Sequence, residues 1–172
     1  MTVLELTITF VFLTIGVESV FLILQLRGRL MSKWLGKNAF ATHATVTCAL
    51  WIVTFLLIAL LQTESHPPFH KSAVFSYIGL GIAIPGLILS IWAFLVLGLK
   101  RALCANFYYD DVPAVKSSIY RYMQNPMDTG FWAALLGFAV FSGSIYNLTI
   151  ALEFIALMLP HAVIENIPLK ED

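Results

Sequence analysis

The stretch YRYMQNPMDTG at residues 120–130 decides how the C-terminal half of this chain folds. It is polar and contains a proline, and it leads into two hydrophobic runs, 126–142 and 145–165, separated only by Gly143-Ser144. Two such runs around a tight turn predict a helical hairpin that returns to the side on which it began. Glu165 ends the second run, so we expect it beside this polar stretch, in a small polar chamber at the edge of a bilayer.

The composition is that of a membrane protein. Of the 172 residues, 59% are hydrophobic and 12% are charged, whereas soluble domains carry roughly 25% charged residues. The length allows four or five spans of about 20 residues, which leaves no room for a separate soluble catalytic domain. The formal net charge is zero, so we expect membrane and lipid partners and no nucleic acid.

Hydrophobic runs predict an all-α fold, a polytopic membrane helical bundle of about five transmembrane helices with a C-terminal helical hairpin. The expected helices cover residues 3–26, 39–62, 73–99, 126–142 and 145–165, within a single integral membrane domain at 1–172. The fourth would be only about 25 Å long, shorter than a hydrocarbon core of about 30 Å. We therefore expect the last two helices to lean into the bundle as a hairpin.

The lysines and arginines predict the orientation. They concentrate at 27–37 and 100–121, and only Lys71 lies in the loop between the second and third helices. The positive-inside rule then places residues 27–38, the 100–124 segment and the C-terminus in the cytoplasm, and the N-terminus outside. The N-terminus lacks a basic region and runs into a long apolar stretch, which predicts a first span and not a cleaved signal peptide. A bacterial inner membrane or the endoplasmic reticulum fits such a multi-pass protein.

Asn125, Pro126 and Asp128 form a favourable helix start. Asparagine is a preferred N-cap, proline is favoured at the first helical position, and a carboxylate in the first turn suits the helix dipole. These preferences explain all three residues without any ligand. The alternative is that the free N–H groups of this helix start bind an anionic ligand, although the charge of Asp128 would compete with it.

Glu165 and His161 lie one turn apart on the same face of the last helix. An acid at a helix C-terminus faces the negative end of the dipole, and a cationic ligand would explain why it is there. Glu18 lies within the first span, where we favour a helix–helix hydrogen bond over a functional role. Gly79, Gly81 and Gly86 favour close helix packing; the alternative is that one of them makes room for the flat ring of a ligand.

The histidines and cysteines predict no metal site. His66 and His70 flank Pro67-Pro68 in a loop, where we expect solvent-facing side chains. Cys48 falls in a span and Cys104 in a loop, which does not suggest a disulfide.

Several of these residues together resemble a known family. Leu97-Gly98, Tyr120-Arg121, Asn125-Pro126-Met127, Gly130, Leu136-Gly137, Ser144 and Glu165 are similar to the core of the small integral-membrane methyltransferases. This family includes the isoprenylcysteine carboxyl methyltransferases and the phospholipid N-methyltransferases, and the Asn-Pro-Met sequence resembles the phosphatidylethanolamine N-methyltransferases most closely. The likeness covers roughly residues 75–168.

The resemblance implies an enzyme that uses S-adenosylmethionine as cofactor. It implies a cofactor site between the third helix, the cytoplasmic 100–125 segment and the hairpin, shaped by Gly86, Tyr120, Arg121, Asn125, Pro126, Gly130 and Glu165. Glu165 would hold the methionyl ammonium or deprotonate the acceptor, with Arg121 and His161 as further candidate catalytic residues. The helix start at 126 would suit the methionyl carboxylate. The acceptor would be a lipid or lipid-anchored group, with a phospholipid amine favoured over an isoprenylcysteine carboxylate.

Gln124, Asp128 and Asn166 depart from the residues usual in this family. Two alternatives therefore stay open: a non-catalytic membrane assembly protein with a degenerate pocket, and a nicotinamide-dependent reductase on the related fold. For methyl transfer, catalysis would come chiefly from positioning and from excluding water. An amine acceptor would also need a base, either Glu165 or His161. A carboxylate acceptor would need a cation instead, either Arg101 or Arg121.

Overall fold

The structure, a computed structural model, describes residues 1–70, 72–109, 115 and 118–165, and these are helices joined by turns and loops. The α-helices are α1 Val3–Leu26, α2 Leu30–Leu35, α3 Ala39–Leu61, α4 Ala73–Leu97, α5 Leu99–Ala102, α6 Pro126–Ser142 and α7 Ile145–Glu165. Three short 3-10 turns, Gly36–Asn38, Ala105–Phe107 and Ser118–Arg121, complete the order. The all-α prediction is confirmed.

Four stretches are long and apolar enough to cross a membrane, so the protein is a multi-pass membrane protein. They are Val3–Leu26, Leu30–Leu61, Ala73–Leu97 and Ile145–Glu165. The fourth predicted helix, α6, has 17 residues and is shorter than these spans, as its sequence length implied. The third predicted helix ends at Leu97 and not at 99, because Gly98 takes a φ of 77° that stops the helix. The short helices α2 and α5 were not predicted.

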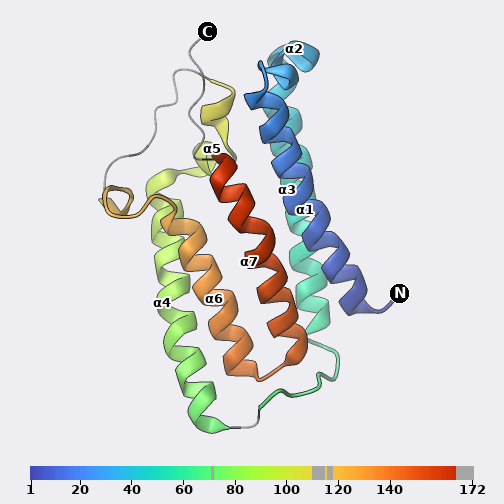
Figure 1. The fold of residues 1–172 in the computed structure, drawn as a ribbon, viewed down its shortest axis with the longest axis vertical. Coiled ribbons are helices and arrows are strands. Elements are labelled where there is room, and N and C mark those ends of the chain that lie inside the picture. Colours follow the sequence, from blue (N-terminus) through green and yellow to red (C-terminus); the bar gives the residue numbers. More distant parts are fainter. Residues whose placement is uncertain (71, 110–114, 116–117, 166–172) are drawn as a thin grey trace.

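The long helices lie side by side and run alternately up and down (Figure 1). α1 packs against α3 and α7, α7 packs against α6, and α6 packs against α4. The main core lies between α1, α3 and α7. Its buried side chains are Val11, Ile15, Leu61, Ile150, Phe154 and Met158.

The interface between α4 and α6 is built on glycines. A Cβ added to Gly79 would lie 2.6 Å from the backbone oxygen of Gly137, and one added to Gly137 would lie 2.7 Å from that of Gly79. Gly86 and Gly130 face each other in the same way. Both pairs are seven residues apart on antiparallel helices, so two glycine contacts bring the backbones together.

Glu18 makes the predicted helix–helix hydrogen bond. Trp51 Nε1, on α3, donates to Glu18 Oε2 at 3.3 Å. Ser19, the next residue, reaches the other way and lies 2.9 Å from His161 Nδ1 on α7. Neighbouring polar residues of α1 therefore tie it to two different helices.

The loop at 62–72 is fastened to the turn between α6 and α7, which defines what we call the hairpin end of the bundle. His66 Nδ1 lies 2.8 Å from Ser144 Oγ, and His70 Nε2 lies 2.6 Å from the Val140 carbonyl. The expectation that both histidines face solvent is wrong, since each is half-buried and bonded. Carbonyl groups freed at helix ends give both imidazoles partners: Val140 at the end of α6 for His70, and Leu61 at the end of α3 for His66.

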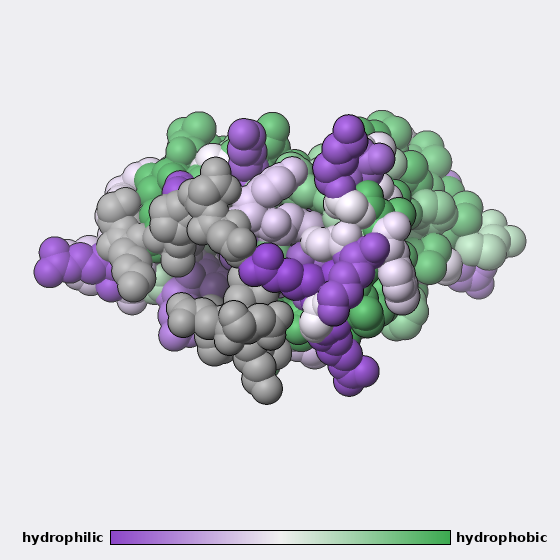
Figure 2. All heavy atoms as spheres, turned by 90° about the horizontal axis from the view of Figure 1, so that it is seen from above, coloured by the Kyte–Doolittle hydropathy of each residue, from purple (hydrophilic) through white to green (hydrophobic). Residues whose placement is uncertain are grey.

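The opposite end, where α1 and α7 terminate, is polar and we call it the cavity end. Figure 2 looks onto this end and shows hydrophilic side chains spread over it, with hydrophobic ones at the margin. Gln25 organises the interior there: its Nε2 donates to Ser32 Oγ and to the Phe107 carbonyl, both at 2.9 Å. This buried amide links α1, α2 and the 105–107 turn.

Candidate functional site

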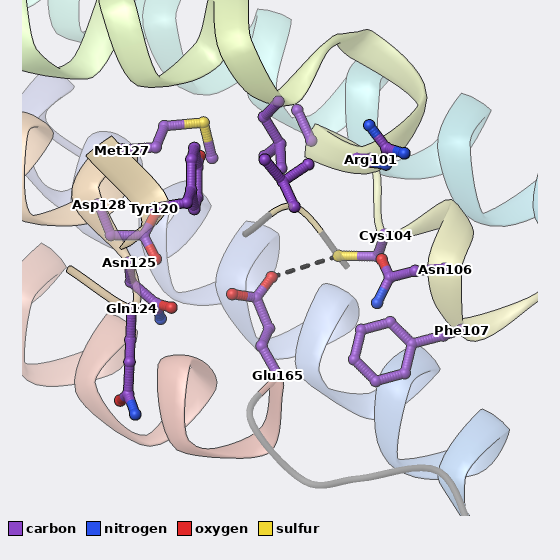
Figure 3. A pocket seen from close by; sticks show the side chains of 13 residues that line it. Arg101, Cys104, Asn106, Phe107, Tyr120, Gln124, Asn125, Met127, Asp128 and Glu165 are labelled. Atoms are coloured by element: carbon purple, nitrogen blue, oxygen red, sulfur yellow. Dashed lines mark hydrogen bonds between the residues drawn. The ribbon is translucent and has the colours of Figure 1, made fainter. Parts of the chain in front are cut away.

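A cavity opens at the cavity end, between the C-terminal ends of α4 and α7, the start of α6 and the segment that follows α4 (Figure 3). Its volume is about 170 Å³, smaller than the roughly 300–1,000 Å³ typical of small-molecule sites, and it is open to solvent on one side. The lining residues are Leu97, Arg101, Ala102, Cys104, Asn106, Phe107, Val115, Tyr120, Gln124, Asn125, Met127, Asp128 and Glu165. The predicted chamber between Glu165 and the 120–126 turn is therefore present.

Glu165 projects into this cavity from the last residue of α7 (Figure 3). Its Oε1 accepts a hydrogen bond from Cys104 Sγ at 3.3 Å and lies 3.4 Å from His161 Nε2. His161 is itself held by Ser19 through its other ring nitrogen. Glu165 is thus positioned by groups from two sides while part of its side chain stays exposed.

His161 is buried and does not line the cavity, although we predicted it as a catalytic candidate. Its position one turn before Glu165 puts the imidazole behind the carboxylate. The arrangement makes it a positioning residue. Ser19, its partner, is 142 positions away in the sequence.

The start of α6 forms another wall. Asn125 is the N-cap residue, but its side chain makes no capping hydrogen bond and lines the cavity instead. Pro126 occupies the first turn as predicted and is buried outside the lining. Asp128 also lines the cavity and is 8% exposed. Since that carboxyl group already faces the positive end of α6, this helix start is a poor site for a second anion.

Of the two arginines considered as candidate cations, Arg101 lines the cavity and Arg121, also predicted at the cofactor site, does not. Arg101, on α5, lines the cavity, and its buried Nε has no hydrogen-bond partner in the part of the chain that the structure describes. Arg121 is exposed and lies over the Tyr122 ring at 6.0 Å. The 3-10 turn at 118–121 points the side chain of Tyr120, its neighbour, into the cavity, and Arg121 is not among the lining residues.

Tyr120 and Cys104 are neutral hydrogen-bond donors in this wall. The Tyr120 hydroxyl donates to the Ala93 carbonyl at 3.4 Å. Burial, with the nearby carboxyl groups of Asp128 and Glu165, raises the pKa of Tyr120 to about 12. Burial and the same Glu165 carboxylate raise the pKa of the Cys104 thiol well above its usual value. Both groups therefore keep their protons at physiological pH.

Gly86 and Gly130 do not line the cavity. The space in front of each is filled by the facing helix, because a Cβ on Gly86 would lie 2.6 Å from Ala134 N and one on Gly130 2.5 Å from Ser90 N. Neither glycine therefore reaches the cavity in which we expected the cofactor. Close helix packing, which we favoured for Gly79, Gly81 and Gly86, is confirmed for Gly79 and Gly86 and is wrong for Gly81, because nothing lies within 4 Å of its Cβ position.

Sequence reasoning assigned no site role to Cys104, Gln124 or Asp128, which all line the cavity. Cys104 takes a left-handed backbone conformation, with φ 60°, that turns the chain back under α4. No sequence pattern predicts a left-handed backbone conformation at a cysteine. Asp128 carried no distinguishing signal either, since a helix-start acid that lines a pocket has the same spacing as one that faces water.

The described lining residues of the cavity carry more acidic than basic groups, which indicates the charge of the ligand that would fit. Two carboxyl groups, of Asp128 and Glu165, share the cavity with one guanidinium, of Arg101. A ligand that carries two positive groups and one negative group would complement them. The Arg101 Nε, which has no partner among the described residues, and the Asn125 amide, which makes no capping bond, add donors for its polar atoms.

Comparison with known proteins identifies the family. Residues 74–171, more than half of the chain, match the phospholipid methyltransferase family. No curated protein and no solved structure matched the chain. The matched region contains α4, α6, α7 and every lining residue of the cavity. The protein is therefore a membrane methyltransferase that belongs to the phospholipid methyltransferase family.

Proposed function

We propose that the protein transfers a methyl group from S-adenosylmethionine to the amine of a phospholipid, within the cavity lined by Arg101, Asp128 and Glu165. The observation that carries this proposal is the charge pattern of the cavity, two acids and one guanidinium. S-Adenosylmethionine has the complementary pattern, with a sulfonium, an ammonium and a carboxylate. The family match supports a phospholipid acceptor.

The residues present fit this cofactor. Arg101, whose Nε lacks a partner, would bind the methionyl carboxylate in place of the helix start that we first expected. Asp128 and Glu165 would face the two cationic groups, and the Asn125 amide and Tyr120 would hold the polar edge of the nucleoside. When bound, the cofactor supplies an electrophilic methyl group on a sulfonium.

Glu165 has a second task in this scheme, besides facing the cofactor. An amine acceptor arrives as an ammonium and must lose a proton before its nitrogen can attack. Glu165 Oε2, the oxygen not engaged by Cys104 and His161, is the group that would accept this proton. His161 and Cys104 keep the carboxylate in place, and the apolar walls of Leu97, Phe107 and Met127 exclude water.

The membrane would position the lipid acceptor at the cavity. The cavity opens at the end of the bundle that carries Arg27, Arg29, Lys33 and Lys37, which supports a cytoplasmic location by the positive-inside rule. The N-terminus would then lie outside and the C-terminus inside. The acyl chains of the acceptor would stay in the bilayer, so that only its headgroup enters the cavity.

The direct test is cofactor binding to the detergent-purified protein by isothermal titration calorimetry. The wild type should bind S-adenosylmethionine, and Glu165→Gln and Arg101→Gln should each weaken binding about 10-fold or more, as expected for a charge-assisted hydrogen bond. Glu64→Gln, at the exposed hairpin end, and Arg121→Gln are the matched controls and should bind like the wild type. No binding to the wild type at millimolar cofactor would overturn the proposal.

The acceptor is tested with S-adenosylmethionine that carries a deuterated methyl group. Vesicles containing phosphatidylethanolamine should gain the label on the headgroup nitrogen, detected by lipid mass spectrometry. An S-farnesylcysteine substrate serves as the comparison. Labelling of its carboxylate alone would move the assignment to an isoprenylcysteine-type acceptor, and Arg101 would then be the group that faces that carboxylate.

A further inference from the structure

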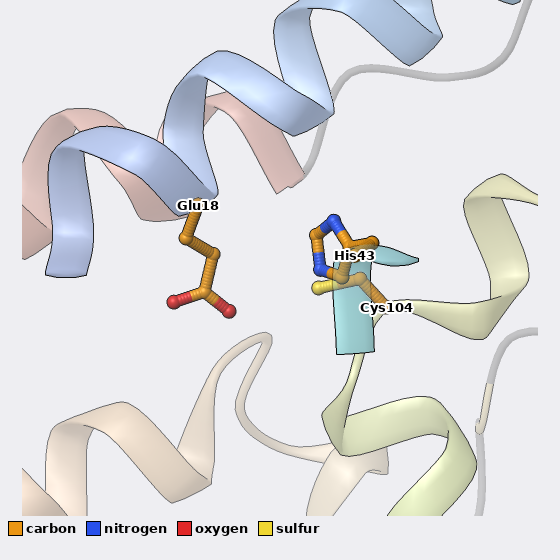
Figure 4. A group of neighbouring side chains, drawn as sticks. All are labelled: Glu18, His43 and Cys104. Carbon is orange, nitrogen blue, oxygen red and sulfur yellow. The ribbon is translucent and has the colours of Figure 1, made fainter. Parts of the chain in front are cut away.

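Three buried side chains from different segments meet beside the cavity: Glu18 of α1, His43 of α3 and Cys104 of the segment after α5 (Figure 4). One carboxylate oxygen, one imidazole nitrogen and the thiol sulfur all lie within 4.8 Å of one another. Exposed fractions are 6%, 0% and 4%. The methyl transfer proposed above makes no use of Glu18 or His43.

The imidazole of His43 has an unexplained nitrogen. Its Nε2 is buried and has no hydrogen-bond partner among the described residues, whereas its Nδ1 lies 3.0 Å from the Tyr108 hydroxyl. Buried polar atoms nearly always have a partner. Thr47 Oγ1, one turn further along α3, is also buried without one. The two buried atoms therefore lack a polar or ionic partner in the space around His43.

The Tyr108 contact suits a histidine that binds a metal. Metal-bound histidines usually donate their other ring N–H to an oxygen, which fixes the tautomer and the ring. If His43 Nδ1–H donates to Tyr108 Oη, the lone pair of Nε2 is left free. The ring is also held by Phe21, whose centroid lies 5.5 Å away.

We propose that Glu18, His43 and Cys104 bind a zinc-type divalent cation. A thiolate, an imidazole and a carboxylate are all ligands that Zn²⁺ takes, and three protein ligands leave a fourth position for water or for another group. A hard cation such as Mg²⁺ is disfavoured, because it prefers oxygen ligands alone. The three elements that contribute are 25 and 61 positions apart, so the ion would join α1, α3 and the cavity wall.

The distances leave little to adjust. Bonds of about 2.0–2.3 Å to a tetrahedral ion place its ligand atoms roughly 3.5 Å apart. Because all three atoms lie within 4.8 Å of one another, no separation has to close by more than about 1.3 Å, within reach of small side-chain rotations of a glutamate. Trp51 holds one oxygen of that glutamate, so its carboxylate is already turned toward α3.

Binding replaces a proton by the ion. The S–H bond of Cys104 breaks, a sulfur–zinc bond forms, and the proton leaves through the cavity that Cys104 lines. The thiol then no longer donates to Glu165 Oε1, which becomes available to a ligand in the cavity. Thiolate and carboxylate together balance the two charges of the ion.

The metal content of the full-length protein tests this. The protein is purified in detergent under reducing conditions without a polyhistidine tag, exposed to Zn²⁺, dialysed and analysed by inductively coupled plasma mass spectrometry. About one zinc per chain is expected for the wild type, with loss of zinc in Cys104→Ser and His43→Gln. Cys48→Ser, which removes the half-buried cysteine of α3, should keep it. Absence of zinc from the wild type, or its retention by Cys104→Ser, overturns the proposal.

A measurement on the wild type alone covers the case in which the variants fail to fold. Co²⁺ is added in place of zinc, and a thiolate-to-cobalt charge-transfer band at one equivalent is the expected signature. Bound metal should also protect Cys104, but not Cys48, from alkylation in urea-free buffer, as read by peptide mass spectrometry. Lack of the band together with equal alkylation of Cys104 with and without metal contradicts the site. Since neither readout involves the methyl donor, failure here and failure of the proposed function are distinguishable.

Discussion

A Cβ added to Gly86 would lie 2.7 Å from the backbone oxygen of Gly130, and a Cβ on Gly130 would lie equally close to the backbone oxygen of Gly86. This reciprocal contact holds α4 against α6. Lipid tails are as apolar as the helices, so close van der Waals packing is what associates them. It also sets the wall of the cavity, because α6 begins only one turn before Gly130.

Gly86→Ala should therefore destabilise the protein. Forcing a methyl group between packed backbones costs about 1–3 kcal/mol, which exceeds the gain of up to about 1 kcal/mol from better helix propensity. Gly81→Ala is the matched control on the same helix, since nothing lies within 4 Å of its Cβ position. Thermal unfolding in detergent, followed by circular dichroism, should show a lower midpoint for Gly86→Ala only. Equal midpoints in the two variants would refute the contact.

The long helices were predictable from the sequence because each is a continuous apolar run with a polar or glycine boundary. The bounds of α1, α6 and α7 follow from Thr2, Asn125-Pro126 and Gly143-Ser144, which are local signals. Helix lengths and the side to which α7 returns need no long-range information. The meeting of Glu165 with the 120–126 turn could therefore be predicted.

By contrast, the sequence could not predict which of Arg101 and Arg121 lines the cavity. Both arginines lie in polar turns after α4, and which of them enters the cavity depends on the path of the segment between α5 and α6. That path contains residues with a positive φ at Cys104 and Ser118. The hydrophobic periodicity of the sequence does not reveal such backbone conformations. For the same reason, the meeting of His43 with Glu18 and Cys104 has no sequence signature.

His161 should act on the cofactor through Glu165. Its imidazole lies 3.4 Å from Glu165 Oε1 and is closed off from the cavity. His161→Ala should weaken S-adenosylmethionine binding in the wild type, by less than Glu165→Gln does, and should have little effect when Glu165 is already glutamine. A double-mutant cycle by calorimetry measures this coupling. Additive losses would show that the two side chains act independently.

Tyr120 should not contribute to the pH dependence of the enzyme. Burial beside Asp128 and Glu165 raises its pKa to about 12, so it stays protonated at every lower pH and only begins to ionise near that value. The rate of methyl transfer between pH 6 and 10 should have the same profile in Tyr120→Phe as in the wild type, at a lower level if the hydroxyl holds the cofactor. An alkaline limb that is present in the wild type and disappears in Tyr120→Phe would contradict this assignment.

Gly143 is expected to be the most sensitive glycine of the hairpin end. Its φ is +62°, and a Cβ there would lie 2.6 Å from the carbonyl oxygen of His70, which belongs to the loop that closes this end. Alanine in this left-handed conformation costs about 1–2 kcal/mol from backbone strain alone. Gly28 also has a positive φ, +68°, and its Cβ position meets only Lys33 Nζ, at 3.8 Å, so Gly28→Ala is the control for a positive φ without a clash. The unfolding midpoint of Gly143→Ala should fall below that of Gly28→Ala because the loop must also move, and protease cleavage at 62–72 should become faster in Gly143→Ala only. Similar midpoints and unchanged cleavage would mean that the loop is not held by this turn.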